Sequence, residues 1–399
     1  MLELLFAALG FLFGALSGLV PALHNNTLTE VLLSLHLPLE PHLIAIFIIA
    51  MAGARVVFEF VPSIFLFVPD ENTVLSVLPG QRMLMEGKGL RALRVTACSA
   101  LLSLALSVML APLALALFQG LYQTLRPFSP FFLIFASAYL LSTERRPGKV
   151  ILATVVFLLS GALGIFVLHG TLLRDPFLPS FTGLFAMPAL LLALRSPRPV
   201  PAQERRWEVD ARTLLPSVLT GIMLGALADL FPGLSSAAQI SVFASAFLYF
   251  TPEKFLATVS AIATSHTVFS LIALVSTNKA RIGAAVAVSE LLGDLGGAEL
   301  LMLLGAAAVS IAVSAATLIA FGEKIAGLIL RIDNKALNLL LLAFIPLFVL
   351  LLEGASGIIV LLIASALGLI PPLAGVRRTH LMGLILVPTM LWLFQTPFW

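Results

Sequence analysis

Two short strings place polar residues directly after a proline within otherwise apolar sequence. The first string contributes Gly18, Pro21, His24, Asn25, Asn26 and Thr27, and the second contributes Asp229, Pro232, Gly233, Ser235 and Ser236. A proline lacks the backbone donor that a helix needs, and Asn, Thr or Ser can cap a helix that restarts beyond it. Free N–H groups at such a restart attract anions. The strings therefore predict an oxyanion site between broken helices; the alternative is that both prolines end a helix at the membrane surface.

A charged pair and its counterpart form the second candidate site. Arg55 and Glu59 are four residues apart in an apolar run, so both can lie on one face of a helix. A shift of 211 residues brings Arg55 onto His266 and Glu59 onto Ser270. An arginine inside a membrane is costly unless it is paired or faces a cavity. Arg55 can hold an anion, and the titratable His266 can bind a proton with it; a structural ion pair is the alternative.

Pro62 and Pro69 bracket a run too short to cross a membrane, which predicts a re-entrant hairpin with a polar tip. Oxygen-bearing side chains in and after this run can bind a sodium ion or gate access to the site, and they can instead cap the next helix. The candidates for ion coupling or gating are Glu59, Ser63, Asp70, Asn72, Thr73 and Asp229.

No string in the sequence has the pattern of an enzyme's catalytic group. The chain contains no G-x-S-x-G, H-E-x-x-H or Walker string, and its six histidines lack a metal-binding spacing. The one cysteine, Cys98, excludes a disulfide within the chain. We therefore expect no enzyme activity, no metal site and no cofactor, with Na⁺ and H⁺ equally open as the coupling ion.

The elements that position these residues must be membrane helices. Of 399 residues, 60% are hydrophobic and 11% are charged, and the mean hydropathy is +1.09. Apolar spans recur along the chain but several are short, so we expect an all-α integral membrane protein with about 10 to 13 transmembrane helices plus re-entrant hairpins. Lys and Arg gather in short loops at 82–94, 145–149 and 195–212. Their scatter excludes a nucleic-acid surface and predicts that these loops are cytoplasmic.

The sequence also reads as two duplicated halves with broken helices at a central site. The shift of 211 residues brings Pro21 onto Pro232, and a shift of 200 brings Gly183 onto Gly383. We predict a first transmembrane repeat at 1–196, a basic cytoplasmic linker at 197–212 and a second transmembrane repeat at 213–399. Paired halves with interrupted helices are typical of secondary transporters with a site near the membrane midplane. The sequence leaves open whether the halves are parallel or inverted.

These strings resemble the large permease family of the tripartite tricarboxylate transporters, in its shorter archaeal-type form. The Gly-rich break with a Pro-Gly pair in that family is similar to the strings 18–23 and 229–234. A second family string, a Pro-Gly loop followed by a conserved-type Asp-Gly-Tyr-Pro-Met-Ala run, is loosely similar to 78–89. The chain departs from the family at Ala22, where glycine is usual, and at the polar run that follows it.

The resemblance implies a secondary active transporter, a permease, for small organic anions such as carboxylates, driven by an ion gradient across the cytoplasmic membrane. Alternating access around the two Pro-broken helices is the mechanism that we expect. The implied partners, besides membrane lipid, are a small membrane subunit and an extracytoplasmic binding protein; a homodimer stays open. The alternative function is translocation of a polyprenyl-phosphate lipid carrier, because a related group of membrane proteins has a similar break and a phosphate suits the same helix ends.

Overall fold

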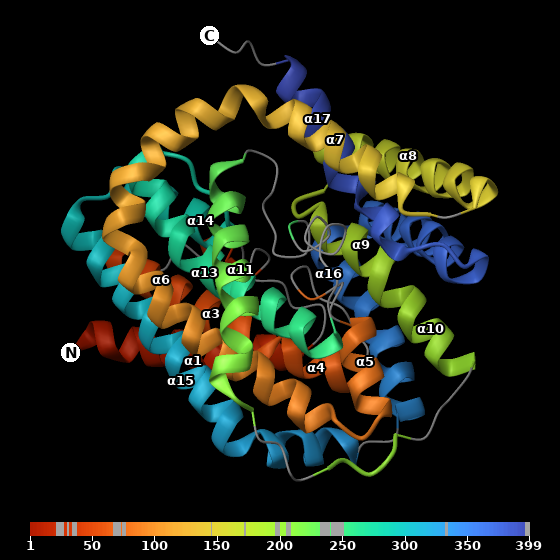
Figure 1. Cartoon of the computed structure of the whole chain (residues 1–399), viewed down its shortest axis with the longest axis horizontal. Coiled ribbons are helices and arrows are strands. Elements are labelled where there is room, and N and C mark those ends of the chain that lie inside the picture. Colours follow the sequence, from red (N-terminus) through yellow and green to blue (C-terminus); the bar gives the residue numbers. More distant parts are fainter. Residues whose placement is uncertain are drawn as a thin grey trace. The chain divides into compact units, whose positions relative to one another are not determined.

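The computed structural model describes residues 1–20, 28–29, 32–33, 38–66, 73, 77–144, 146–170, 173–195, 200–204, 209–231, 240, 251–331 and 334–395. Every regular element within these ranges is a helix (Figure 1). The predicted all-α class is therefore confirmed for the described chain. Its helices gather into two compact units, and each unit is considered by itself.

Unit 1 holds the helices that carry the candidate site residues. They are α1 (Leu2–Leu19), α3 (Pro41–Phe58), α4 (Phe60–Phe65), α5 (Val77–Met85), α6 (Gly89–Leu125), α11 (Ala211–Leu230), α13 (Pro252–Thr277), α14 (Gly283–Leu292) and α15 (Gly297–Leu330). Unit 2 holds η1 (Arg126–Phe128), α7 (Ser129–Ser142), α8 (Pro147–His169), α9 (Phe177–Phe181), η2 (Thr182–Ala186), α10 (Met187–Arg195), α16 (Asn334–Ala374), η3 (Arg378–Met382) and α17 (Gly383–Gln395).

Nine helical segments in the described ranges are long and apolar enough to cross a membrane. Two of them, Gly89–Ser142 and Asn338–Ala374, are longer than one crossing requires. The segments that contain α3 and α13 are 89% and 94% buried within the protein, whereas α1 is only 22% buried. The outer helices expose large apolar side chains that need an apolar surrounding. The chain is thus a multi-pass membrane protein with α3 and α13 at the interior of unit 1.

Glycines bring α1 and α11 into close contact with the helices that follow them. A Cβ at either of two α1 glycines would collide with a carbonyl of α3; the pairs are Gly10 with Phe47 and Gly14 with Met51. The same collision would occur between α11 and α13; the pairs are Gly221 with Thr258 and Gly225 with Ile262. All four pairs obey the shift of 211 residues. Small residues spaced by four allow such backbone approach between membrane helices.

The two predicted halves exchange helices within unit 1. The Ser103 hydroxyl of α6 donates to the Ala261 carbonyl of α13, at 2.9 Å. The Ser310 hydroxyl of α15 donates to the Ala50 carbonyl of α3. Ala50 and Ala261 are again 211 residues apart. A helix of the first half therefore packs on the core helix of the second half, and the reverse contact is equivalent.

The core helices α3 and α13 run in opposite directions. One apolar cluster joins the first part of α3, represented by Ile44 and Ile48, to Leu271 and Leu274 near the end of α13. The start of α14 and the start of α15 belong to the same cluster. Because equivalent helices of the two halves are antiparallel here, the structure resolves the orientation that the sequence leaves open in favour of an inverted arrangement.

Unit 2 contains a second set of equivalent contacts. Its largest helix, α16, is interrupted at Gly354, where φ is +67°. A Cβ at Gly164 of α8 would collide with the Leu384 carbonyl of α17, and one at Gly368 of α16 would collide with the Leu184 carbonyl of η2. Leu184 and Leu384 are 200 residues apart, the offset expected for the ends of the two halves. Here too a helix of each half packs on the other half.

Two carboxylates in unit 2 act as reciprocal caps. Glu144, between α7 and α8, accepts a hydrogen bond from the Arg377 N–H at 3.0 Å, just before η3. Glu353, next to the α16 interruption, accepts hydrogen bonds from the Arg174 and Asp175 N–H groups at 2.7 and 3.0 Å, just before α9. Each carboxylate satisfies backbone donors at the start of a short helix in the other half.

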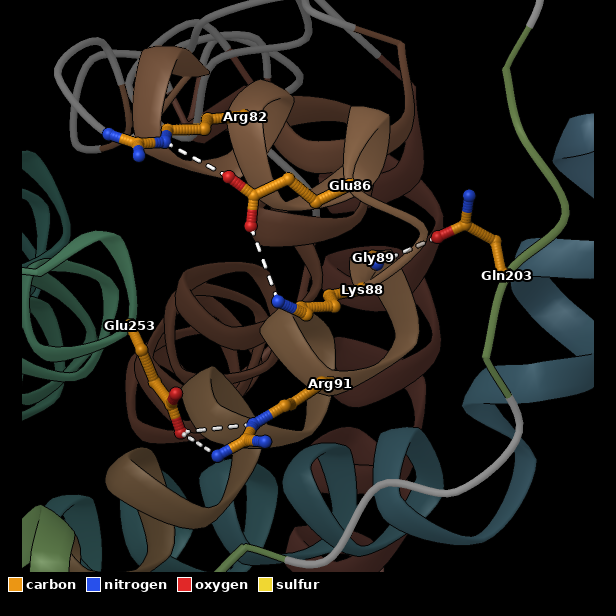
Figure 2. A network of polar contacts seen from close by, with 7 residues as sticks. All are labelled: Arg82, Glu86, Lys88, Gly89, Arg91, Gln203 and Glu253. Atoms are coloured by element: carbon orange, nitrogen blue, oxygen red, sulfur yellow. Dashed lines mark hydrogen bonds and ion pairs between the residues drawn. The ribbon is translucent and has the colours of Figure 1, made fainter.

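The described part of the predicted linker packs on the turn between α5 and α6 (Figure 2). The Gln203 side chain accepts from the Gly89 N–H at 2.7 Å and donates to the Leu84 carbonyl at 3.1 Å. On the same turn, the Arg91 guanidinium binds one carboxylate oxygen of Glu253 at 3.1 and 3.2 Å. The linker thus belongs to the same end of unit 1 as the starts of α6 and α13.

The compact units do not follow the predicted boundaries at 1–196 and 213–399, because each unit contains helices from both halves. The duplication itself stays a prediction. It is supported by the equivalent glycine and serine contacts, which the offsets of 211 and 200 residues relate to one another.

Candidate functional site

Helices α1 and α11 end at equivalent residues with equivalent geometry. α1 ends at Leu19, and its cap Val20 has φ −98° and ψ 114°. α11 ends at Leu230, and its cap Phe231 has φ −98° and ψ 119°. A proline follows within two residues in each case, which explains why neither helix continues. The final carbonyls of both helices consequently need partners other than the next helical turn.

Arg55 satisfies the end of α1. Its Nη1 donates to the Ser17 carbonyl at 2.8 Å, and its side chain is 3% exposed. The Glu59 carboxylate lies 3.9 Å from Nε and is also buried. Gly18 is required beside this contact, because a Cβ there would lie 2.8 Å from the Cβ of Phe58. A cation at a helix C-terminus is favourable because of the helix dipole, so Arg55 is held in place by the broken helix.

His266 occupies the equivalent position in the second half. Its Nδ1 lies 3.0 Å from Oδ2 of Asp229, and both side chains are buried, at 4% and 0% exposure. Asp229 stands where the first half has Gly18. With Asp229 ionised, the Nδ1–H of His266 donates to the carboxylate. The sequence-predicted residues Asp229 and His266 are therefore brought into direct contact.

Arg281, in the turn between α13 and α14, completes this second site. Its Nε donates to the Asp229 carbonyl at 3.0 Å, so it satisfies the end of α11 as Arg55 satisfies the end of α1. Its guanidinium stacks over the Tyr122 ring of α6, 5.2 Å from the ring centre. The sequence reasoning misses Arg281 because it treats basic residues in short turns as topology signals. The offset of 211 residues would have found it, since it pairs Arg281 with the predicted site residue Asp70.

Several buried polar atoms around Asp229 lack a hydrogen-bond partner within the described residues. They are Oδ1 of Asp229, the hydroxyl of Ser270 and Nη2 of Arg281. Ser270 lies one turn beyond His266 on α13 and acts on the Asp229 carboxyl. Native proteins leave few buried polar groups unpaired, and such groups often mark a binding site. The second site thus offers both acceptors and a donor to a ligand.

Both sites lie at similar depth. Arg55 is near the middle of the 25-residue segment Pro41–Phe65, and His266 is near the middle of the 26-residue segment Pro252–Thr277. Ionisable residues at membrane depth are expensive and usually functional. A site near the midplane formed at the ends of interrupted helices is characteristic of secondary transporters.

The structure also describes the residues of the predicted hairpin up to Leu66. Pro62 and Ser63 are buried in α4, and the interruption between α3 and α4 falls at Glu59, about one turn before Pro62. The proline ring and its missing N–H account for a break at that distance. Thr73 is buried. The other predicted site residues lie outside the described residues; they are Pro21, His24, Asn25, Asn26, Thr27, Pro69, Asp70, Asn72, Pro232, Gly233, Ser235 and Ser236.

Among the described residues, no group of three or more His, Cys, Asp or Glu is placed to hold a metal ion. What those residues do provide is a pair of buried charged sites at the ends of two interrupted helices. A polytopic helical membrane protein with this arrangement has the features of a membrane transporter.

Comparison with known proteins agrees with this class. The model of the Tripartite tricarboxylate transporter TctA family matches residues 4–383, so the chain belongs to that family. An uncharacterized protein of Methanocaldococcus jannaschii is 26% identical over 409 residues, which cover 99% of this chain and 100% of that protein. No solved structure matches.

Family membership confirms the resemblance that the two broken-helix strings indicate. It makes the chain a transporter of the tricarboxylate type, rather than an enzyme, in the cell membrane. Membership of a tripartite family also implies association with a small membrane subunit and an extracytoplasmic binding protein.

Proposed function

We propose that this chain is the permease of a secondary active transporter for small organic anions of the carboxylate class. The observation that carries the proposal is the pair of buried sites near the middle of α3 and α13, each of which presents an arginine to the end of an interrupted helix. The sequence-predicted substrate residues and the coupling ion enter this proposal as they entered the sequence analysis.

Buried arginine suits a carboxylate substrate. A guanidinium keeps its charge at any physiological pH and presents several N–H donors in a plane, which matches the two oxygens of a carboxylate. Arg55 and Arg281 are the arginines that contact the ends of α1 and α11. Asn25, Asn26 and Thr27, together with Ser235 and Ser236, follow these ends in the sequence and would add neutral donors.

The antiparallel arrangement of α3 and α13 supports alternating access. In an inverted repeat, the same contact that closes one face of the membrane in the first half closes the other face in the second half. Exchange of small rearrangements between equivalent sites then opens the substrate site to each side in turn. We propose that α1 and α11, which end beside Arg55 and Asp229, are the elements that move.

The charges at the two ends of unit 1 give the proposal an orientation. The end with the starts of α6 and α13 carries Arg91 and Lys254, whereas the start of α3 carries Glu40. By the positive-inside rule, the former end is cytoplasmic and the start of α3 is extracytoplasmic. A binding protein would therefore deliver its anion at the end that carries Glu40.

Ligand-induced thermal stabilisation of the purified protein tests the proposal. Citrate and smaller carboxylates would be compared with a short-chain polyprenyl phosphate, each with and without sodium. A ligand that binds only the folded state raises the melting temperature by mass action. We expect stabilisation by at least one carboxylate, and its loss in Arg55→Ala when each shift is measured from that variant's own baseline.

Arg82→Ala is the matched control, because Arg82 is 70% exposed and contacts only the surface network of Figure 2. It should keep the carboxylate response of the wild type. Stabilisation by polyprenyl phosphate alone would overturn the small-anion proposal in favour of the lipid-carrier translocase.

A further inference from the structure

We propose that the Asp229–His266 pair is the proton-coupling site of the transporter, and that Arg281 binds a carboxylate of the substrate when this pair has taken up a proton. The inference rests on the proposed function, since it names the coupling ion and an additional substrate-binding residue. It does not concern Arg55, whose contact with the first broken helix lacks a histidine.

The geometry around Asp229 carries the proposal. The carboxylate uses Oδ2 for His266, while Oδ1 has no partner among the described residues. The main-chain carbonyl of the same residue holds Nε of Arg281, whose Nη2 is also unpartnered in the described chain. A buried donor on a cation and a buried acceptor on its neighbour are therefore joined through one residue, at the end of α11.

The charge of this cluster depends on one proton. With Asp229 ionised and His266 neutral, the arginine and the carboxylate balance each other and the cluster is neutral. When the pair takes up a proton, the cluster gains a net charge of one unit, and Arg281 is left with no opposing charge. A buried, uncompensated cation attracts an anion, so each site raises the affinity of the other by the same factor. The anion and the proton would then cross together.

The neighbouring charges are consistent with a proton rather than a sodium ion. Asp229 from α11 and Arg281 from the turn before α14 are the charged groups that act on His266, with Tyr122 of α6 stacked on the guanidinium. The other elements packed on α13 carry charged groups that enter no hydrogen bond with His266 in the described structure; they are Arg55 and Glu59 of α3, Arg82 of α5, Glu290 of α14, and Glu299, Glu323 and Lys324 of α15. A sodium ion beside Asp229 would be repelled by Arg281.

Substrate exchange in proteoliposomes separates this inference from the proposed function. Radiolabelled citrate counterflow, which needs no ion gradient, tests whether the protein transports a carboxylate. Net citrate uptake driven by an inward proton gradient, compared with an inward sodium gradient, tests the coupling. We expect wild-type counterflow, and net uptake that the proton gradient accelerates about tenfold while the sodium gradient does not.

The informative variant is His266→Arg, because it places in the second half the residue that stands at the equivalent position in the first half. It should keep counterflow and lose acceleration by the proton gradient. Arg281→Gln should lose both. Arg91→Ala, a change in the surface ion pair with Glu253, is the matched control and should behave as the wild type.

Proton uptake can be measured without these variants. Calorimetric titration of the wild-type protein with citrate in two buffers of different ionisation enthalpy gives the number of protons bound with each anion, and a titration of His266→Gln under the same conditions subtracts the ionisation of citrate itself. One additional proton in the wild type supports the inference. Counterflow that is accelerated only by sodium, or equal proton uptake in both proteins, overturns it; absence of citrate counterflow and of citrate binding refutes the proposed function as well.

Discussion

Arg55 and His266 occupy the same position in the two halves, yet their surroundings differ in kind. Arg55 is a permanent cation that contacts the end of α1 directly. His266 is a titratable base that contacts the carboxylate of Asp229, and the end of α11 is held instead by Arg281. The backbone frame around these residues is almost unchanged, as the caps Val20 and Phe231 show.

This difference teaches that packing and charge have separate origins in the molecule. The contacts that the halves share involve backbone carbonyls and glycines, which any divergence of side chains must preserve because a Cβ does not fit. The contacts that differ involve side chains at the helix ends. A duplicated frame can therefore hold one fixed charge and one switchable charge at the same depth.

The largest effect is expected at the shared glycine contacts. Gly14→Val and Gly225→Val each push side-chain atoms into backbone on the neighbouring helix, so each should destabilise the fold by about 3 kcal/mol. Gly120→Val is the control, since a Cβ at Gly120 meets no atom within 4 Å. Recovery of folded protein in detergent and its melting temperature measure the effect. If one half tolerates the change and the other does not, the two contacts are not equivalent.

A smaller effect is expected at the reciprocal caps of unit 2. Glu144→Gln and Glu353→Gln weaken hydrogen bonds to backbone donors in the other half, and each should cost about 2 kcal/mol. Burial raises the pKa of the Glu144 carboxyl, but the hydrogen bonds from the Arg377 N–H and His380 outweigh it, so this pKa lies below its ordinary value of 4.5. The stability from Glu144 is therefore complete above that ordinary value and is lost as the pH falls through the lowered one.

Melting temperatures of the wild type and of Glu144→Gln, followed from neutral to acidic pH, measure this contribution. The gap between the two proteins should be constant near neutrality and should close in acid. A gap that widens as the pH falls would contradict the role of the ionised carboxylate. Ser142→Ala, at the exposed end of α7, is the control.

The smallest effect is expected where the halves have diverged at a surface. Glu253 at the start of α13 pairs with Arg91, whereas the equivalent residue of α3, His42, lies 3.4 Å from Glu40. Both side chains of the Arg91–Glu253 pair are partly exposed, at 41% and 29%. A double-mutant cycle with Arg91→Ala and Glu253→Ala should give a coupling of about 0.5 kcal/mol that falls with added salt. A coupling several times larger would mean that this pair fixes the core helices.

Composition and spacing predict the membrane-helical class, because a chain this apolar has no surface suited to water. The offset of 211 residues also predicts that Arg55 and His266 take equivalent positions, since helices of equal register carry them. The sequence does not predict Arg281, whose place depends on how a turn folds back against α11, nor the exchange of helices between halves, which depends on packing over long separations. The residues after Pro21 and Pro232 remain predictions.

The exchange of helices has a consequence for biosynthesis. When the ribosome has released the first half, α3 lacks α15 and η2 lacks α16, because both partners are still to be made. Buried serines and the donors before α9 must then wait in the membrane without their final acceptors. Neither half can reach its native packing alone, so maturation is a single late event, and a chain truncated in the linker should be degraded rather than accumulate as a folded fragment.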